Sequence, residues 1–534
     1  MSIHRESILS QFACYPCFNS FHALGSFSSL RPAILLSLMS LCLPATATLA
    51  PAPVAAPVTA QTATHACRLP AFPQEVQCGQ IQRPLNPAQP DGKKISIHFA
   101  VLPSQDRNKL ADAVFLLAGG PGQSAISVAG FGQAVLSRLN RRRDLVFVDQ
   151  RGTGRSAALH CPELEDGGDI VDNDSMQKMT HSCMTKLQTL AYGDLQYFST
   201  SIAVQDLEAV RLAQGYSAIN LVGASYGTRA GLEYLRQFPQ SVRRLVLDGV
   251  TPPTMRLPAA DAQAALDGVF AACAKDARCQ QAYPDLAARW AHLLNSMPQQ
   301  ISVLHPRLGN PLSLPMSRDA LLGLVHKTLY SATTTAALPY ALSQAAQGKF
   351  AALLTLSGNF ALPGPAGIAY GMHFSVWCGE AYAPSFPLAA TPPRDEFERM
   401  ASDMYGKACQ QWPRAQIPAG FFTLPVSRAP VLLLSGGIDP VTPSRHAAAV
   451  AQALGNKARH IHIDNAGHGL LTHGCVRDVV YRYINASDDA GAIAVDADCV
   501  RQIPRPLAWL APLATLSPAS PAAPIALIQN GAKP

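Results

Sequence analysis

The amino-acid sequence predicts an α/β fold, in which a mostly parallel central sheet is interrupted by a largely helical cap insertion. Apolar strand-like runs alternate with amphipathic helix-like runs through residues 67–250, which indicates parallel strands joined by helices. Residues 251–418 are rich in Ala and Leu at helical spacing, so we expect the cap there. Strand-like runs return in residues 419–505 and complete the sheet. Residues 506–534 form a Pro- and Ala-rich tail that we expect to be loose.

The individual strands differ in their hydrophobic pattern. Residues 77–85 and 94–102 alternate polar and apolar side chains, as paired antiparallel strands do. The run 113–118 is continuously apolar, which is typical of a parallel strand buried on both faces. We expect further strands at 144–149, 219–222, 243–250, 430–435 and 459–464, and helices at 203–213 and 229–238.

The first 50 residues resemble a targeting segment rather than part of the fold. A short apolar run, Pro32–Leu43, precedes the small residues Ala45–Ala47, which fit a small-x-small cleavage site. The run is too short for a stable membrane anchor, so we predict a signal peptide at 1–50. Its long leading region leaves an uncleaved anchor as the alternative. Residues 51–66 are predicted to be a flexible leader, and the mature chain to be periplasmic or secreted.

Cysteine usage agrees with export. Three of the 13 cysteines precede or lie in the predicted signal, and the remaining ten are an even number, which favours disulfides in an exported chain. No pair of C-x-x-C motifs suggests a metal site, and we expect none. Sequence alone leaves the connectivity open, but the spacing favours sequential neighbours. These are Cys67 with Cys78, Cys161 with Cys183, Cys273 with Cys279, Cys378 with Cys409, and Cys475 with Cys499.

The charge balance argues against a nucleic-acid partner. Forty-two Lys and Arg against 35 Asp and Glu give a net charge of +7, spread over 534 residues. The densest basic run, Arg141–Arg143, has no interleaved aromatic residues, so a solvated loop is the better interpretation. No motif indicates a bound cofactor.

A candidate nucleophile follows the strand at 219–222. Gly223–Gly227 reads G-A-S-Y-G, a G-x-S-x-G motif between a strand and an amphipathic helix. A serine hydroxyl attacks well only when a sharp turn exposes it beside a base. The flanking glycines allow such a turn, so Ser225 is the predicted nucleophile. The chance occurrence of this short motif is the alternative, and the strand-turn-helix context argues against it.

Two further residues complete a catalytic triad in the predicted order. Asp439 follows one strand in S-G-G-I-D-P, and His468 follows the next in N-A-G-H-G. In such a triad the histidine takes the serine proton, and the acid orients and supports the imidazolium. An ordinary turn aspartate and a loop histidine are the alternatives. His473 is the rival base.

The glycine run Gly119–Gly122 ends the strand at 113–118. An oxyanion hole needs backbone N–H groups that a substrate carbonyl can approach, and residues without side chains allow this. We predict the N–H groups of Gly120 and Tyr226 as the two donors. The run lacks the Lys-Ser/Thr of a phosphate-binding loop, which leaves an ordinary tight turn as the alternative.

Together these motifs are similar to the proline iminopeptidase and tripeptidyl aminopeptidase family of α/β-hydrolases. G-G-P-G, then D-Q-R-G-T-G-R-S from Asp149, then G-A-S-Y-G-T-R carry the resemblance, which spans about residues 67–499. The end of the chain resembles the tripeptidyl branch. Many iminopeptidases have His before the glycine pair, where this chain has Ala118, so the resemblance does not imply strict proline specificity.

The resemblance implies an exopeptidase whose cap closes one end of the cleft and holds the substrate ammonium. Val376–Glu380, V-W-C-G-E, resembles an acid-bearing segment of the family, so Glu380 is the candidate anchor. A surface acid or an internal ion pair explains Glu380 equally well. Asp149 and Arg151 are interpreted as structural residues.

We therefore expect an exported serine aminopeptidase that forms an acyl-enzyme and acts on a peptide or small acyl substrate. An esterase on the same scaffold is the alternative, because fold and triad do not fix the acyl group. A non-catalytic exported binding protein is a third possibility. The sequence leaves the natural substrate and the oligomeric state open.

Overall fold

The computed structural model describes residues 63–511, except 71, 73, 166–172, 257–258, 260, 306–307, 359–366 and 383–392. The predicted signal peptide and most of the predicted leader lie outside the described residues, as do residues 512–534 of the expected tail. No helix in the described part of the chain is long and apolar enough to cross a membrane.

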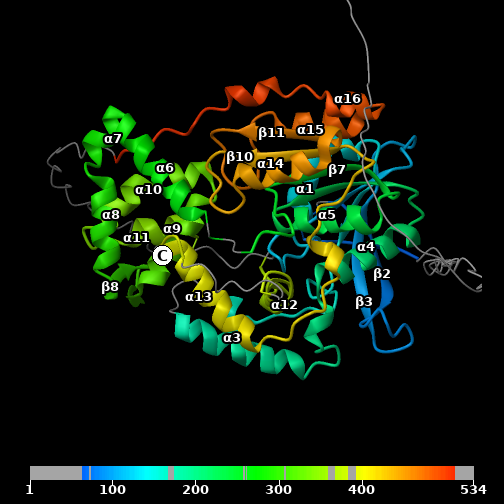
Figure 1. The fold of residues 1–534 in the computed structure, drawn as a ribbon, viewed down its shortest axis with the longest axis horizontal. Helices are drawn as coiled ribbons and strands as arrows, with labels where there is room; N and C mark the ends of the chain where they lie inside the picture. The colour runs from blue at the N-terminus through cyan, green and yellow to red at the C-terminus, as the bar shows by residue number, and fades with distance from the viewer. Residues whose placement is uncertain are drawn as a thin grey trace, which may run out of the picture. The chain divides into compact units, whose positions relative to one another are not determined.

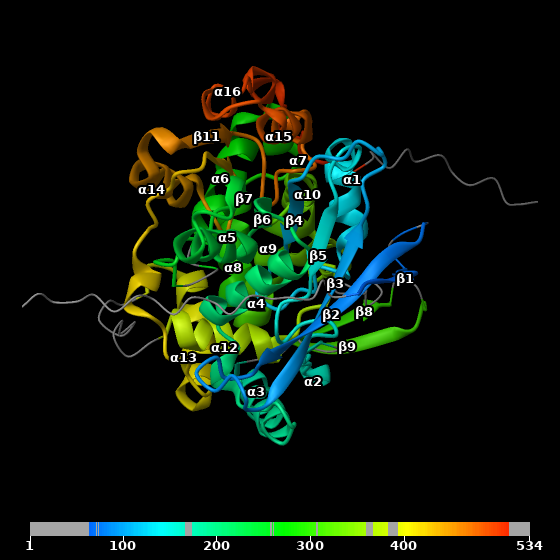
Figure 2. The same cartoon turned by 90° about the vertical axis from the view of Figure 1, so that its right-hand side faces the viewer.

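Nine of the described strands form one sheet, in the order β1-β2-β3-β5-β4-β6-β7-β10-β11 (Figures 1 and 2). β1, β2, β3 and β5 pair antiparallel, and all later neighbours pair parallel. The bounds are β1 His65–Cys67, β2 Val76–Pro84, β3 Lys94–Leu102, β4 Ala113–Leu117, β5 Leu145–Val148, β6 Ile219–Ala224, β7 Val242–Asp248, β10 Val431–Gly436 and β11 Ala458–Ile463.

The central parallel strands are mostly apolar because helices cover both faces of the sheet. Phe115 and Leu117 of β4 join the hydrophobic cluster that contains α4, α5 and α14, whereas Val114 and Leu116 join the cluster that contains α1 and α15. Such alternation follows from the two-residue period of a strand. The helix bounds are α1 Ala129–Asn140, α4 Thr200–Ala213, α5 Tyr226–Gln237, α14 Ser444–Leu454 and α15 Val476–Asn485.

The long insertion lies between β7 and β10 and has a hydrophobic core of its own, to which Leu266, Leu321 and Leu342 belong. It is mostly helical, as expected, but also contains the antiparallel pair β8–β9, seen in Figure 2. Its elements are α6 Ala262–Lys275, α7 Ala277–Ala282, α8 Leu286–Asn295, β8 Gln299–Leu304, β9 Pro311–Met316, α9 Arg318–Leu329, α10 Ala332–Ala345, α11 Ala351–Leu356, α12 Tyr370–Glu380 and α13 Glu396–Gln411.

Helix α12 packs with the sheet rather than with the insertion core. Met372, Phe374 and Trp377 belong to the same cluster as the β4 residues Phe115 and Leu117. A second, shorter excursion after β5 packs near it, with α3 against α13 and η2 against α12. Its elements are α2 Pro162–Glu165, α3 Asn173–Gln188 and η2 Leu195–Tyr197, and the remaining short elements are η4 Ala419–Phe422, η5 Gly455–Lys457, α16 Asp489–Ile493 and η6 Asp498–Gln502.

All ten cysteines of the described chain are in disulfides, and each is joined to its sequential neighbour, as the spacing suggested. The pairs are Cys67–Cys78, Cys161–Cys183, Cys273–Cys279, Cys378–Cys409 and Cys475–Cys499.

The start of the expected loose tail is packed against the insertion. The N–H of Trp509 donates to the carbonyl of Ala336 at 2.9 Å, and the indole lies 4.3 Å from the ring of Tyr340, measured between centroids. The hydroxyl of Tyr283 donates to the Trp509 carbonyl at 2.9 Å. The prediction of a loose tail was therefore wrong for residues 506–511, because one tryptophan in the Pro- and Ala-rich segment anchors it.

Candidate active site

Ser225 stands in a sharp turn between β6 and α5. Its φ of 54° and ψ of −121° are unusual for a residue with a side chain, and such strain is characteristic of functional turns. A Cβ on Gly223 would lie 2.4 Å from the carbonyl oxygen of Gly227, and one on Gly227 would lie 2.1 Å from that of Leu117. Only glycine fits at either position, so both glycines of the motif are needed to form the turn.

Asp439 and His468 follow the adjacent strands β10 and β11 and contact each other. Nδ1 of His468 lies 2.9 Å from Oδ2 of Asp439. Oδ1 of Asp439 accepts the N–H groups of Val441 and Thr442, each at 2.8 Å. The Thr442 hydroxyl donates to Oδ2 at 2.7 Å and lies 3.0 Å from His468 Nδ1. The buried carboxylate is therefore held on both oxygens and directed at the imidazole.

The electrostatics of this pair favour an ion pair when the histidine is protonated. Burial alone would lower the pKa of His468, but the charge and hydrogen bond of Asp439, together with the charge of Asp248, outweigh burial and raise that pKa above its usual value. Burial likewise opposes the charge on Asp439, yet His468 and the hydrogen bonds from Thr442 hold its pKa below the usual range. The site thus stabilises an imidazolium beside a carboxylate.

Ser225 and His468 are brought together through Asp248 and Gly249. The Ser225 N–H donates to the Asp248 carbonyl at 2.8 Å. A Cβ on the next residue, Gly249, would lie 3.0 Å from Cε1 of His468. No hydrogen bond joins the described side chains of Ser225 and His468, and bonds of this kind often tighten only with substrate in place. Among the described residues, the rival base His473 forms neither a hydrogen bond nor an ion pair with Asp439.

The predicted oxyanion loop lies beside the serine. A Cβ on Gly119 would be 3.3 Å from Cβ of Ser225, and Gly120 has a φ of +104°, which favours glycine. Within the described residues, neither the N–H of Gly120 nor that of Tyr226 donates a hydrogen bond. Both predicted donors thus have no partner in the described part of the chain.

Glu380, the candidate ammonium anchor, is buried in an ion pair. It is 1% exposed, and its Oε2 lies 3.2 Å from Nη1 of Arg229, a residue of α5. Its Oε1 accepts the N–H of Thr200 at 2.8 Å. The Arg229 guanidinium also donates to the carbonyls of Pro252 and Met255. Both carboxylate oxygens are engaged, so the structure favours the internal ion pair over the ammonium anchor.

Asp149 and Arg151 have the structural surroundings that we expected. Oδ1 of Asp149 accepts the Ser124 hydroxyl at 2.6 Å and the Ile126 N–H at 3.1 Å, just beyond the glycine loop. Arg151 is buried and forms two hydrogen bonds with Asp206, at 2.7 and 2.9 Å. The D-Q-R-G segment braces the loops behind the site.

Three residues near the triad were not found by sequence reasoning. Tyr330, at the end of α9, accepts the His468 N–H on its carbonyl at 2.7 Å, and its ring meets the imidazole edge-on. Thr442 supports Asp439, and the buried Asp248 carboxylate accepts the N–H groups of Leu470 and Leu471. Thr442 lies three residues after the acid and could have been proposed. Tyr330 lies far away in sequence and gave no signal.

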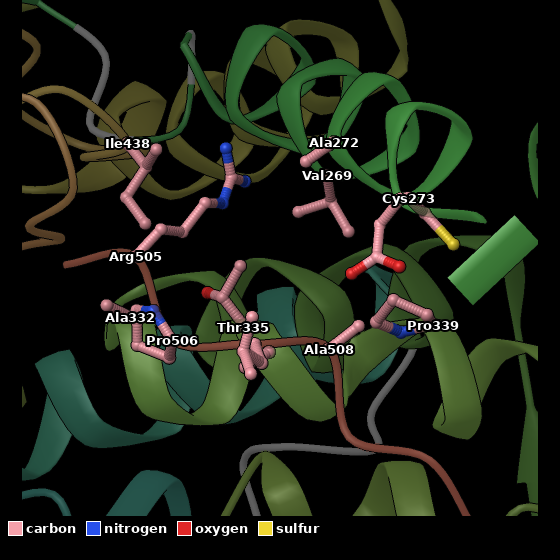
Figure 3. A pocket seen from close by; sticks show the side chains of 13 residues that line it. Val269, Ala272, Cys273, Ala332, Thr335, Pro339, Ile438, Arg505, Pro506 and Ala508 are labelled. Atoms are coloured by element: carbon pink, nitrogen blue, oxygen red, sulfur yellow. The ribbon is translucent and has the colours of Figure 1, made fainter. Parts of the chain in front are cut away.

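A separate cavity of about 110 Å³ lies where the C-terminal segment crosses the insertion. Figure 3 shows Arg505 and Ile438 at one end and Cys273 and Pro339 at the other. Ile438 precedes Asp439 in the chain, but neither Ser225 nor His468 lines this cavity. We do not assign it to the active site.

The sheet order, the strained serine turn and the Asp–His pair after successive strands define the class of this protein. The chain belongs to the family described as alpha/beta hydrolase fold, which matches residues 112–472, and it is an enzyme of that fold.

Known relatives include two named peptidases. The chain is 26% identical to the serine protease Hip1 of Mycobacterium tuberculosis (strain H37Rv) over 463 residues, which cover 77% of this chain and 86% of the relative. It is 28% identical to a tripeptidyl aminopeptidase of Streptomyces lividans over 197 residues, covering 34% and 37% of the two chains. A solved proline iminopeptidase of Mycobacterium smegmatis is 15% identical and aligns with 78% of this chain and 100% of its own, at a TM-score of 0.35.

Proposed function

We propose that this chain is an exported serine aminopeptidase, which hydrolyses peptide bonds near free N-termini through an acyl-enzyme. The observation that carries the catalytic part is the buried Asp439–His468 pair, placed after β10 and β11 beside the strained Ser225 turn. These three residues supply the nucleophile, the base and the orienting acid of a catalytic triad, and they follow in the chain order Ser, Asp, His.

In the proposed reaction, His468 Nε2 takes the proton of the Ser225 hydroxyl as Oγ attacks the substrate carbonyl. Asp439 accepts the Nδ1–H of the same ring, which fixes the tautomer and supports the imidazolium. The N–H groups of Gly120 and Tyr226 donate to the oxyanion. His468 then protonates the leaving amine, and water, activated by the same base, hydrolyses the acyl-Ser225 ester.

The peptidase assignment is supported by the relatives named serine protease and tripeptidyl aminopeptidase, and by the glycine-loop and nucleophile motifs. An esterase remains the second candidate for a specific reason. Because Glu380 is paired with Arg229, the described residues give no unpaired carboxylate for a substrate ammonium at the predicted place.

Export is supported by the cysteines and by the first 50 residues. Every cysteine of the described chain is in a disulfide, which is typical of proteins that fold in an oxidising compartment. The predicted signal would direct the chain there. N-terminal sequencing of the mature protein, recovered from periplasm and medium, tests this part, and recovery of intact Met1 on cytoplasmic protein would contradict it.

The activity is tested with matched chromogenic substrates on native and Ser225→Ala protein. We expect aminoacyl and tripeptidyl amides with a free N-terminus to be cleaved, and their N-acetylated counterparts to be cleaved poorly. Equal rates on both would replace the aminopeptidase by the esterase. Full activity of Ser225→Ala on every substrate would refute the catalytic assignment.

A further inference from the structure

The glycine loop after β4 is attached to the segment that begins α12. The Ala369 N–H donates to the carbonyl of Gly122 at 2.9 Å, and Gln123 forms an antiparallel bridge with Ile368. A Cβ on Gly122 would lie 2.7 Å from the Ala369 carbonyl oxygen. The loop and this segment are therefore in direct backbone contact, although some 245 residues separate them in the sequence.

One side chain of α12 reaches the middle of the loop. Nδ1 of His373 lies 3.2 Å from the carbonyl oxygen of Pro121, and Nε2 lies 2.9 Å from the hydroxyl of Tyr405. Burial lowers the pKa of His373 to about 4, so the ring carries one proton at neutral pH. A carbonyl only accepts, so that proton lies on Nδ1, and the Tyr405 hydroxyl donates to Nε2.

The two helices that carry this pair are fastened to each other. The Cys378–Cys409 disulfide links α12 to α13, close to His373 on one helix and to Tyr405 on the other. The Trp412 indole donates to the Ser375 hydroxyl at 3.0 Å. The rings of His373 and Tyr405 are stacked, with centroids 5.9 Å apart. Contacts with α13 thus restrain His373 and leave it little freedom to move away from Pro121.

We propose that His373 is a positioning residue for catalysis, which, oriented by Tyr405, fixes the Pro121 carbonyl and thereby the N–H of Gly120 beside Ser225. This inference rests on the proposed function, because it assumes that the Gly120 N–H meets the oxyanion. Oxyanion donors are effective only when they are already in place before charge develops. A loop rich in glycine has many backbone conformations, so it needs an external constraint.

The test uses three variants of the full mature chain. His373→Phe keeps a ring in the aromatic surroundings but removes both hydrogen bonds, and we expect kcat to fall roughly 10- to 100-fold with KM changed less than about 3-fold. His373→Asn retains an N–H near the position of Nδ1, and it should recover part of the lost kcat. Tyr405→Phe leaves the imidazole in place but removes the hydroxyl that determines which ring nitrogen carries the proton. In this variant kcat should fall by roughly 3- to 10-fold.

A second readout separates positioning from packing. A reversible peptide aldehyde forms a tetrahedral adduct on Ser225, and its affinity should fall in parallel with kcat in His373→Phe. The matched control is Tyr483→Phe, which removes the hydrogen bond from a buried tyrosine hydroxyl to the Leu245 carbonyl without touching the loop. It should lower the melting temperature but leave kcat and aldehyde affinity unchanged.

Wild-type kcat in folded His373→Phe, or equal kcat losses in His373→Phe and Tyr483→Phe, would overturn the proposal. If His373→Phe does not fold, Tyr405→Phe decides, and wild-type kcat and aldehyde affinity in that variant would overturn it. Failure of the proposed function looks different: Ser225→Ala would stay active, or the native protein would not cleave any of the substrates.

Discussion

The carbonyl oxygen of Asp248 accepts the N–H of Ser225 at 2.8 Å, while the carboxylate of the same residue holds the loop that follows His468. Each oxygen of this buried carboxylate accepts the Leu470 N–H at 2.8 Å, and Oδ2 also accepts that of Leu471 at 3.0 Å. Asp248 ends β7, between the strand of the serine and the strand before the acid. It therefore links the proposed nucleophile to the loop of the proposed base.

Asp248→Asn should weaken catalysis by displacing the His468 loop. An amide oxygen in the place of Oδ2 could still accept both N–H groups, but the NH2 group in the place of Oδ1 would set a donor against the Leu470 N–H. Such a mismatch of buried donors costs about 1–3 kcal/mol. We expect kcat to fall roughly 10-fold as well, since the imidazole would be less well placed. Chemical denaturation and steady-state kinetics measure the two effects.

The control for Asp248 is Asp276, whose carboxylate caps α7 by accepting the N–H groups of Arg278 and Cys279. Asp276→Ala should cost about 1 kcal/mol of stability, as loss of a helix cap does, without changing kcat. Unchanged kcat in Asp248→Asn as well would show that the loop is held by other contacts.

Removal of the proposed triad residues should reduce turnover far more. Ser225→Ala and His468→Ala are expected to lower kcat by on the order of 10⁴-fold or more, and Asp439→Asn somewhat less. Thr442 still donates to position 439 in that last variant, but the tautomer of His468 is no longer fixed. Titration with a serine-reactive phosphonate measures the labelled fraction, and labelling of Ser225→Ala at the native rate would contradict the assignment.

The activity should rise with pH as His468 loses its proton. The Asp439 carboxylate raises the pKa of His468, so the midpoint of kcat/KM should lie above the unperturbed value of about 6.5. Asp439→Asn removes the stabilising charge while burial remains, so the midpoint should move to lower pH. A midpoint that is the same in both proteins would assign the titration to another group.

The parts of the site that lie in one short segment were predictable from the sequence. Ser225, with glycines on both sides, follows an apolar strand, and Asp439 and His468 each follow one too. The strand patterns identified most of the sheet for the same local reason. The β8–β9 pair was missed because the insertion around it is Ala- and Leu-rich at helical spacing, although Gln299–Met316 itself contains no alanine.

Contacts between distant segments could not be predicted. The Glu380–Arg229 pair spans 151 positions, and the contact between His373 and Pro121 spans 252. A single sequence shows that a glutamate is present but not which residue will face it after folding. Tyr330 and Asp248 were missed for the same reason, since their importance comes only from the loop of His468.

The Glu380–Arg229 ion pair allows a test of two roles for Glu380, a structural ion pair or an anchor for the substrate ammonium. Both groups are 1% exposed, and the guanidinium also lies 4.9 Å from the centre of the Trp377 ring. Burial raises the pKa of Glu380, and the Arg229 charge opposes this rise. Glu380→Gln would leave the buried Arg229 charge without its partner, so we expect a stability loss of about 3–5 kcal/mol.

A structural role for Glu380 predicts equal kinetic effects on substrates with free and blocked N-termini, because substrate ammonium never meets the carboxylate. An ammonium anchor predicts a loss of roughly 10- to 200-fold in kcat/KM on free-amine substrates alone, since a charge-assisted hydrogen bond is worth about 1.5–3 kcal/mol. Thermal unfolding and kinetics of Glu380→Gln on both substrates distinguish the two roles. Because Arg229 and Thr200 engage both carboxylate oxygens of Glu380, we expect equal kinetic effects on the two substrates. An unchanged melting temperature, together with a loss of kcat/KM on free-amine substrates alone, would show instead that Glu380 is the ammonium anchor.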